Sequence, residues 1–212
     1  QMPLMEWTLD QLDLYKNPLM SLEGRTDIKR LSEKNGLSIP SVTGDCFMQE
    51  PFWKTNSRNR APLVDDFTSI LSACGSLGMQ TLVIPLVDNG ALNSGKEEKC
   101  LIDVVERQEL ALKSMGLKIA FESDYAPLVL ARFIDKLNPE FFGINYDVGN
   151  SAALGFNVRD EFLNYGQRIL NVHIKDRVLG GSTVPLGRGH ADFETVFSGL
   201  AELNYKGNYI LQ

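Results

Sequence analysis

Apolar runs alternate with amphipathic segments along the chain. A recurring unit consists of an amphipathic segment, a glycine and a short run rich in Ile, Val and Leu, as in "LSACGSLG" followed by "MQTLVIPLV". A glycine at a helix end can adopt the left-handed conformation that turns the chain back, and near-continuous apolar runs are typical of strands covered on both faces. The pattern predicts seven strands, near residues 3–9, 37–43, 81–87, 117–122, 141–147, 169–175 and 208–212. It predicts helices between them, near 22–35, 62–77, 97–115, 126–138, 158–167 and 193–204.

Local signals support several of these helix boundaries. Pro62 and Pro127 stand where helices are expected to begin, and a proline is tolerated there because the first N–H groups of a helix have no partner within it. Asn157 and Asp192 are expected to be N-cap residues.

Alternation of strand and helix predicts a parallel α/β fold, either an open doubly wound sheet or a barrel. No G-x-G-x-x-G follows the first strand. Polar residues come after many of the strands and do not gather at a single crevice of the sheet, which favours the barrel. A (β/α)8 TIM barrel typically needs about 250 residues, whereas this chain has 212, opens almost directly on a strand and stops on one. We therefore expect a single barrel domain over residues 1–212, lacking the first strand–helix unit and the last helix.

Composition and charge narrow the class of protein. Hydrophobic residues make up 43% and charged residues 23%, which is ordinary for a globular protein. The formal net charge is −6, whereas proteins that bind nucleic acid usually carry an excess of basic residues, so nucleic-acid binding is not expected. No apolar run approaches the roughly 20 residues of a membrane helix, and no signal peptide is recognisable. The three cysteines share no metal-type spacing and are expected to be reduced thiols, so we expect a cytoplasmic protein without membrane or nucleic-acid partners.

Candidate chemistry lies at the carboxyl ends of the predicted strands, where parallel barrels carry their functional groups. The polar residues at these ends are Asp10, Asp45, Glu122, Asp147, His173 and Gln212. Spacings of 25 and 26 residues separate Glu122, Asp147 and His173, about one strand–helix unit each. These three side chains are therefore expected on adjacent strands, facing a common volume.

Two carboxylates and one imidazole suit a divalent cation such as Mn²⁺, Mg²⁺, Co²⁺ or Zn²⁺. Coordination would also remove the cost of placing a carboxylate at the end of an apolar strand. Each residue has a structural explanation as well. A histidine on a strand is more often a hydrogen-bonded core residue, and a strand-end carboxylate is more often a cap or an ion-pair partner. Spacing alone leaves both interpretations open.

Four segments, "IAFES", "INYDVGNSAALG", "NVHIKDR" and "VPLGRGHADF", in this order, resemble the xylose isomerase-like barrel superfamily of sugar and sugar-phosphate isomerases and epimerases. The resemblance spans essentially the whole chain, from "MEWTLD" at the family's second strand to "NYILQ" at its eighth. The D-x-G-N, H-x-K-D and G-x-G-x-x-D-F elements are together fairly specific for the superfamily, and they are poor guides to substrate.

The resemblance implies a divalent metal, with Mn²⁺ preferred, held by Glu122, Asp147, His173 and a fourth residue at Gln212. The family has a glutamate at the fourth position. An amide oxygen can bind a metal, but a glutamine cannot accept and return a proton. In the family's epimerases two glutamates form the acid–base pair, so Glu122 would remain as the catalytic base here. An isomerase can work with one base, whereas an epimerase would need another acid or a bound water.

The chemistry implied by the resemblance is proton abstraction next to a carbonyl through an enediolate, by a metal-dependent isomerase or epimerase of a sugar or sugar phosphate. The resemblance and strand positions also indicate five substrate-binding residues, Glu6, Trp53, Asn150, Lys175 and Arg177. Each of these residues also has a structural alternative. The alternatives are support behind the site for Glu6, a loop anchor for Trp53, an Asx turn for Asn150, a surface position for Lys175 and a loop ion pair for Arg177.

Three other functions compete with this one. A lyase of the family's dehydratase type uses much the same ligands, and a non-catalytic sugar-binding barrel would be compatible with Gln212. A phosphodiesterase like the apurinic endonucleases, which bind several metals through many histidines, is disfavoured by two histidines and a negative charge. The expected partner is a small-molecule sugar, and the family suggests a homodimer.

Overall fold

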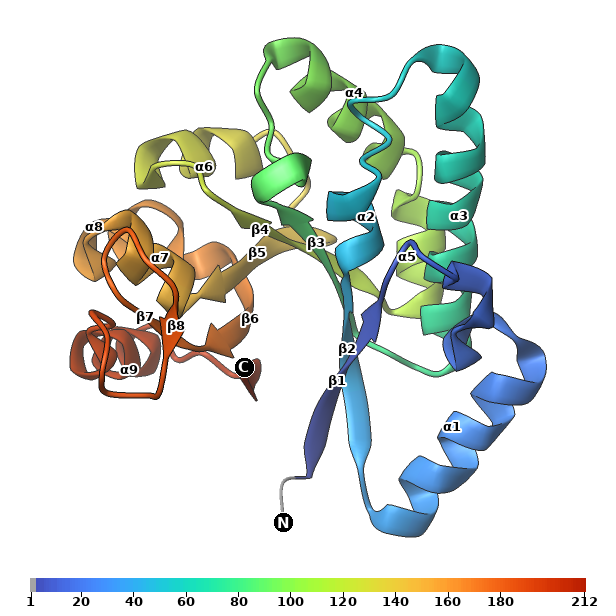
Figure 1. The fold of residues 1–212 in the computed structure, drawn as a ribbon, viewed down its shortest axis with the longest axis horizontal. Helices are drawn as coiled ribbons and strands as arrows, with labels where there is room; N and C mark the ends of the chain where they lie inside the picture. The colour runs from blue at the N-terminus through green and yellow to red at the C-terminus, as the bar shows by residue number, and fades with distance from the viewer. Residues whose placement is uncertain (1–2) are drawn as a thin grey trace. The chain divides into compact units, whose positions relative to one another are not determined.

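The computed structural model describes residues 3–212 and divides the chain into two compact units, Gln1–Ile119 and Ala120–Gln212. Strand and helix alternate along both units (Figure 1). Among the described helices, none is both long and apolar enough to cross a membrane.

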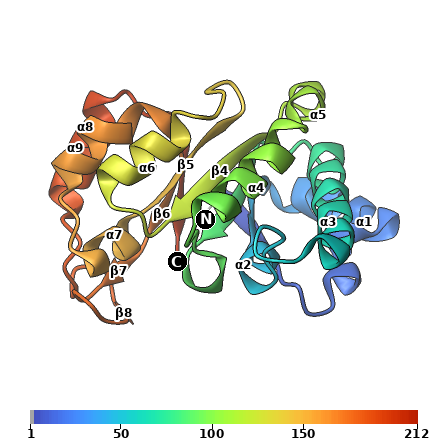
Figure 2. The ribbon, with the colours of Figure 1, turned by 90° about the horizontal axis from the view of Figure 1, so that it is seen from above.

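The first unit contains the parallel strands β1 (Leu4–Leu9), β2 (Ser38–Gly44) and β3 (Thr81–Leu86), in that order. Strand β4 (Lys118–Ser123) crosses the boundary between the units. The helices of this unit are α1 (Leu22–Asn35), α2 (Asp45–Gln49), α3 (Ser57–Ser76), α4 (Gly95–Glu106) and α5 (Glu109–Met115). Helices α1 and α3 lie on the same side of β1 and β2 (Figures 1 and 2). Short 3₁₀ segments occupy Leu14–Lys16, Pro18–Met20 and Asp88–Gly90.

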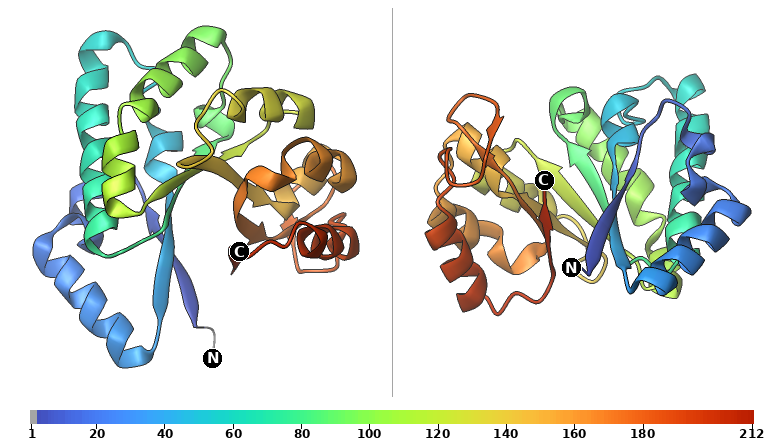
Figure 3. Two further views of the ribbon diagram at one scale, coloured as in Figure 1. Left: turned by 180° about the vertical axis from the view of Figure 1, so that it is seen from behind. Right: turned by 60° about the horizontal axis from the view of Figure 1, so that its bottom comes forward.

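The second unit continues from β4 to β5 (Phe142–Asp147), β6 (Ile169–Ile174) and β9 (Asn208–Leu211), again in chain order. Strand β9 runs parallel to β6, and the chain ends directly after it (Figure 3). The helices are α6 (Pro127–Ile134), α7 (Val148–Leu154), α8 (Val158–Tyr165) and α9 (Phe193–Glu202), and α8 lies between α6 and α9 (Figure 2). A 3₁₀ turn (Gly166–Arg168) directly precedes β6. An antiparallel hairpin of β7 (Asp176–Arg177) and β8 (Thr183–Val184) follows β6.

All seven predicted strands are confirmed, with ends that differ by at most one residue. The reason is burial: every residue of β3 and of β5 is buried, as near-continuous apolar runs require. The predicted helix 22–35 is also confirmed, and Gly36 ends it with a left-handed φ of 60°. Asn157 and Asp192 cap α8 and α9 as predicted.

The prediction that Pro62 begins a helix is wrong. Helix α3 begins at Ser57, because the Asn56 side chain accepts hydrogen bonds from two backbone N–H groups of the first turn. Pro62 therefore lies inside the helix, where it removes one hydrogen bond to the carbonyl four residues earlier. Pro127, by contrast, does begin its helix.

The predicted helix 97–115 is two helices, α4 and α5, separated at Arg107 and Gln108. Helices α2 and α7 were not predicted. Helix α2 begins at Asp45, directly after β2 ends at Gly44, and α7 begins at Val148, directly after β5 ends at Asp147. In both places a strand passes into a helical turn with no loop between them. The Asp147 side chain caps α7 by accepting from the backbone N–H of Asn150.

Candidate functional site

Three polar side chains predicted to converge do so inside the second unit. Glu122 lies near the end of β4, Asp147 ends β5, and His173 lies beside Asp147 on β6 in the strand register. Each contributes one potential ligand atom, and these atoms lie within 4.8 Å of one another. His173 Nδ1 is 3.4 Å from Glu122 Oε2 and 3.9 Å from Asp147 Oδ2. All three residues are buried, with exposed fractions of 8% for Glu122, 4% for Asp147 and 1% for His173.

The Asp147 carboxyl group of this cluster has a raised pKa. Burial raises the pKa of its carboxyl group, and the negative charge of Glu122 raises it further, while the nearby Lys175 ammonium lowers it. Lys175 Nζ is 2.7 Å from Asp147 Oδ2. This oxygen is buried, and its close partner is the Lys175 ammonium group. A further cation beside Oδ2 would therefore offset the cost of its burial.

Gln212 also reaches the cluster, directly after β9. Its backbone N–H donates to the carbonyl of Ile174, which holds the residue beside β6. Its side-chain nitrogen Nε2 is 3.0 Å from His173 Nδ1, and its oxygen Oε1 accepts from Lys175 Nζ at 3.2 Å. A glutamate at this position could accept from Lys175 but could not donate to the imidazole. The amide therefore contacts two residues of the site, Lys175 through its oxygen and His173 through its nitrogen.

Two asparagine amides hold Glu122. Asn145 Nδ2 donates to Glu122 Oε2 at 2.7 Å, and Asn150 Nδ2 donates to Glu122 Oε1 at 2.6 Å. Asn150 was a predicted substrate-binding residue, and the structure places it against the carboxylate. Asn145 was not predicted. Its signal in the sequence is its place two residues before Asp147 on the same strand, which puts both side chains on one face.

Lys175 and Arg177 lie on the two sides of Asp176 at the entry to the β7–β8 hairpin. The guanidinium group of Arg177 donates to Asn150 Oδ1 at 2.7 Å and twice to the carbonyl of Gly181. The chain packs tightly here, because a Cβ at Gly149 would lie 3.0 Å from the backbone of Lys175. This explains the glycine of the D-x-G-N element.

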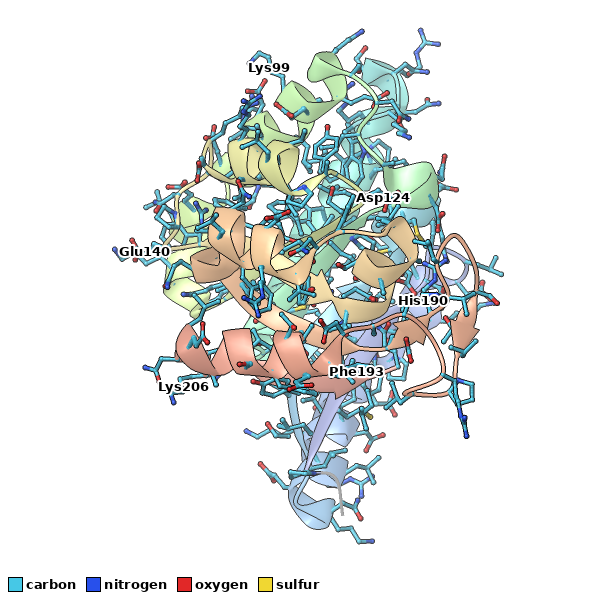
Figure 4. All side chains as sticks on the ribbon, turned by 90° about the vertical axis from the view of Figure 1, so that its left-hand side faces the viewer. Lys99, Asp124, Glu140, His190, Phe193 and Lys206 are labelled. Carbon is cyan, nitrogen blue, oxygen red and sulfur yellow. The ribbon has the colours of Figure 1, made fainter. Side chains whose placement is uncertain are left out.

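The G-x-G-x-x-D-F loop, which carries His190 and leads to Phe193 (Figure 4), is anchored by Asp176. The buried Asp176 carboxylate accepts backbone hydrogen bonds from three loop residues, namely Gly187, Gly189 and Ala191. A Cβ at Gly189 would collide with this carboxylate. The glycine is therefore required by the close approach of Asp176.

A second buried carboxylate, Glu161 on α8, was also not predicted. It is 1% exposed and accepts hydrogen bonds from the hydroxyl groups of Tyr146, Ser151 and Tyr165. Burial raises its pKa although the three hydroxyl donors lower it. Two of these donors adjoin the site in sequence, since Tyr146 precedes Asp147 and Ser151 lies on α7. Glu161 thus joins α8 to the end of β5.

The other two predicted substrate-binding residues belong to the first unit. Glu6 lies on β1, and its Oε1 accepts from the hydroxyl of Thr43 at 2.6 Å. Trp53 is 2% exposed, and its indole N–H donates to the carbonyl of Gly90 at 3.0 Å. Both contacts fit the structural alternatives, which were support behind the site for Glu6 and a loop anchor for Trp53. A role of either residue in substrate binding stays a prediction.

The donor set of the cluster fits a divalent cation. Two carboxylates and an imidazole are ligands that Mn²⁺, Mg²⁺, Co²⁺ and Zn²⁺ accept, and Glu122, Asp147 and His173 present their ligand atoms within 4.8 Å of one another. Burial and the negative charge of Glu122 both raise the pKa of Asp147, and a cation bound between the two carboxylates would offset both effects. These three residues could hold a metal.

Comparison with known proteins agrees with the fold. The sequence model of the family described as xylose isomerase-like TIM barrel matches residues 4–212. The L-ribulose-5-phosphate 3-epimerase UlaE of Salmonella paratyphi A is 24% identical, and the alignment covers 98% of this chain and 76% of that protein.

Two solved structures have the same fold. A xylose isomerase domain protein from Planctomyces limnophilus superimposes with a TM-score of 0.81 at 17% identity, over 100% of this chain and 80% of that one. The IolI protein, whose crystal structure contains a zinc atom, superimposes with a TM-score of 0.76 at 17% identity, over 99% and 78%. The predicted TIM-barrel fold and the predicted resemblance are therefore both confirmed.

Proposed function

The chain belongs to the xylose isomerase-like TIM barrel family, and from this premise we propose that it is a divalent-metal-dependent isomerase or epimerase of a sugar or sugar phosphate. The observation that carries the proposal is the convergence of Glu122, Asp147 and His173, whose ligand atoms lie within 4.8 Å of one another in a buried site. The sugar-phosphate chemistry in the name of the relative UlaE supports the substrate class.

Glu122 is the proposed catalytic base. Glu122, Asp147 and His173 would hold a divalent cation, with Mn²⁺ preferred, and the cation would polarise the substrate's carbonyl group. Glu122 then takes the proton from the carbon next to the carbonyl, and the substrate becomes an enediolate. The two amide hydrogen bonds to its oxygens keep the carboxylate in one orientation for this transfer.

Lys175 is proposed to stabilise the negative charge that develops on the enediolate. Its ammonium group is held between Asp147 Oδ2 and Gln212 Oε1. A fixed positive charge beside buried side chains stabilises a developing oxyanion more than the same charge does in water. Asn150, Arg177, Glu6 and Trp53 stay proposed substrate contacts.

Gln212 bears on the type of reaction. A glutamine cannot transfer a proton as the second glutamate of the family's epimerases does, so the site as built has one carboxylate base, Glu122. One base that moves a proton along one face of the enediolate is sufficient for an aldose–ketose isomerisation. We favour that reaction over a two-glutamate epimerisation. Within this proposal the enzyme acts in the cytoplasm as a homodimer, and both statements stay predictions.

Exchange with solvent deuterium tests the proposal. A panel of ketoses and ketose phosphates is incubated with the full-length protein and Mn²⁺ in D₂O, and deuterium at the carbon next to the carbonyl is measured. We expect incorporation with at least one ketose and none with Glu122→Gln. Loss of water from the sugar would favour the lyase alternative. Sugar binding without any exchange would favour the non-catalytic barrel and contradict the proposal.

A further inference from the structure

The Glu122 carboxylate is held from both sides by amide groups that come from different elements. Asn145 lies on β5, two residues before Asp147, where it pairs with Asn171 of β6, and it is buried. Asn150 lies on α7 and is half-buried. Each donates to a different oxygen of Glu122, at 2.7 Å and 2.6 Å. The carboxylate therefore cannot rotate without breaking at least one hydrogen bond.

A second donor sets the orientation of each amide. Asn171 Nδ2 donates to Asn145 Oδ1 at 2.8 Å, and Arg177 Nη1 donates to Asn150 Oδ1 at 2.7 Å. An amide whose oxygen accepts on one side must present its NH₂ group on the other. In both asparagines the NH₂ group consequently faces Glu122. Arg177 is itself fixed by the carbonyl of Gly181.

We propose that Asn145 and Asn150 are positioning residues for Glu122, and that Asn171 and Arg177 act on Glu122 through them. The inference rests on the proposed function for the role of Glu122 as a base. It assigns to Arg177 an action through Asn150 that does not require contact with substrate. A base must be held in a productive geometry, and a misplacement of about 1 Å can cost roughly 100-fold in rate.

Asn150→Asp is the most direct variant. The new carboxylate has nearly the same shape and keeps an acceptor for Arg177, but it replaces the donor that faces Glu122 with a second negative oxygen. Asn157→Asp is the matched control. Asn157 is the N-cap of α8, where Asp serves as well as Asn, and it makes the same change of charge on the same unit.

Unfolding measurements test the inference without any assay of activity. A double-mutant cycle combines Asn150→Asp with Glu122→Gln, since a glutamine at 122 can donate to the new carboxylate. We expect Asn150→Asp to lower the folding equilibrium constant about tenfold when Glu122 is present and less than about threefold in Glu122→Gln. The Asn157→Asp control should change it less than about threefold in either background. Equal losses in both backgrounds would overturn the inference.

Steady-state kinetics with the ketose found by deuterium exchange then separate positioning from a general structural effect. We expect Asn150→Asp to lower kcat about 100-fold through the misplaced base, whereas loss of a substrate contact at Asn150 would raise KM and leave kcat near its wild-type value. Asn150→His, whose ring N–H can donate to Glu122, should recover part of kcat. An unchanged kcat in Asn150→Asp would overturn the inference. Coupling in the cycle combined with no exchange by the wild-type protein would instead contradict the proposed function and leave the positioning contacts in place.

Discussion

The buried Glu161 makes the stability of this protein depend on pH in a predictable direction. Its carboxylate is 1% exposed and has three hydroxyl donors, from Tyr146, Ser151 and Tyr165. Burial raises its pKa in the folded state. Because the folded protein binds this proton more tightly than the unfolded chain, the contribution of Glu161 to stability is fully present below its ordinary pKa of about 4.3 and is lost as the pH rises through the folded-state pKa.

Glu161→Gln removes this titration while keeping most of the hydrogen bonds. The glutamine oxygen can accept from Tyr146 and Ser151, which share one oxygen of Glu161, and the new NH₂ group can donate to the hydroxyl of Tyr165. We therefore expect Glu161→Gln to gain stability relative to the wild-type protein as the pH rises from 4 toward neutrality. One proton limits the slope of the difference to about 1.36 kcal/mol per pH unit.

Urea unfolding between about pH 4 and pH 7.5 measures this difference. Glu202→Gln is the control, because Glu202 is exposed on α9 and its replacement makes the same change of charge at the surface. The difference between Glu161→Gln and the wild-type protein should rise with pH, whereas that of Glu202→Gln should stay flat. A flat or falling curve for Glu161→Gln would refute the reasoning, because it would mean that the hydroxyl donors outweigh the cost of burial.

Two further predictions concern the substrate side of the site and its loop. Lys175→Met should lower kcat/KM about 100-fold, because it removes the ammonium beside Asp147, while Lys206→Met on the surface should leave it unchanged; steady-state kinetics measure both. Gly189→Ala should destabilise the protein by about 1–3 kcal/mol in urea unfolding, because its Cβ would collide with the Asp176 carboxylate. Gly95→Ala, where a Cβ meets open space at the start of α4, should be neutral or slightly stabilising; equal losses at both glycines would contradict this explanation.

The sequence allowed the strands and the metal-type cluster to be predicted because both depend on strong, local patterns. Buried parallel strands are recognisable as apolar runs, and a polar residue at the end of such a run marks the edge of the sheet where functional groups gather. Glu122, Asp147 and His173 followed directly from this. The Gln212 position followed from the resemblance, and its two side-chain contacts required coordinates.

The residues that support the site were not predicted, for identifiable reasons. Asn145 and Asn171 interrupt apolar strands with a residue type that also suits turns, and nothing local indicates that their amides face each other across two strands. Glu161 stands in an amphipathic helix among charged residues, so its pattern is that of an exposed position. Its hydrogen bonds come from Tyr165 on the same helix and from Tyr146 and Ser151, which lie in other parts of the chain.

Binding of Mn²⁺ to the full-length protein, measured by isothermal titration calorimetry, tests most directly whether the three strand-end residues form one metal site. The chain has two histidines, so His190→Gln is a matched control for His173→Gln. The account predicts about one Mn²⁺ per chain, unchanged affinity in His190→Gln and at least about tenfold weaker binding in His173→Gln. Absence of Mn²⁺ binding, or equal binding by the two variants, would contradict it.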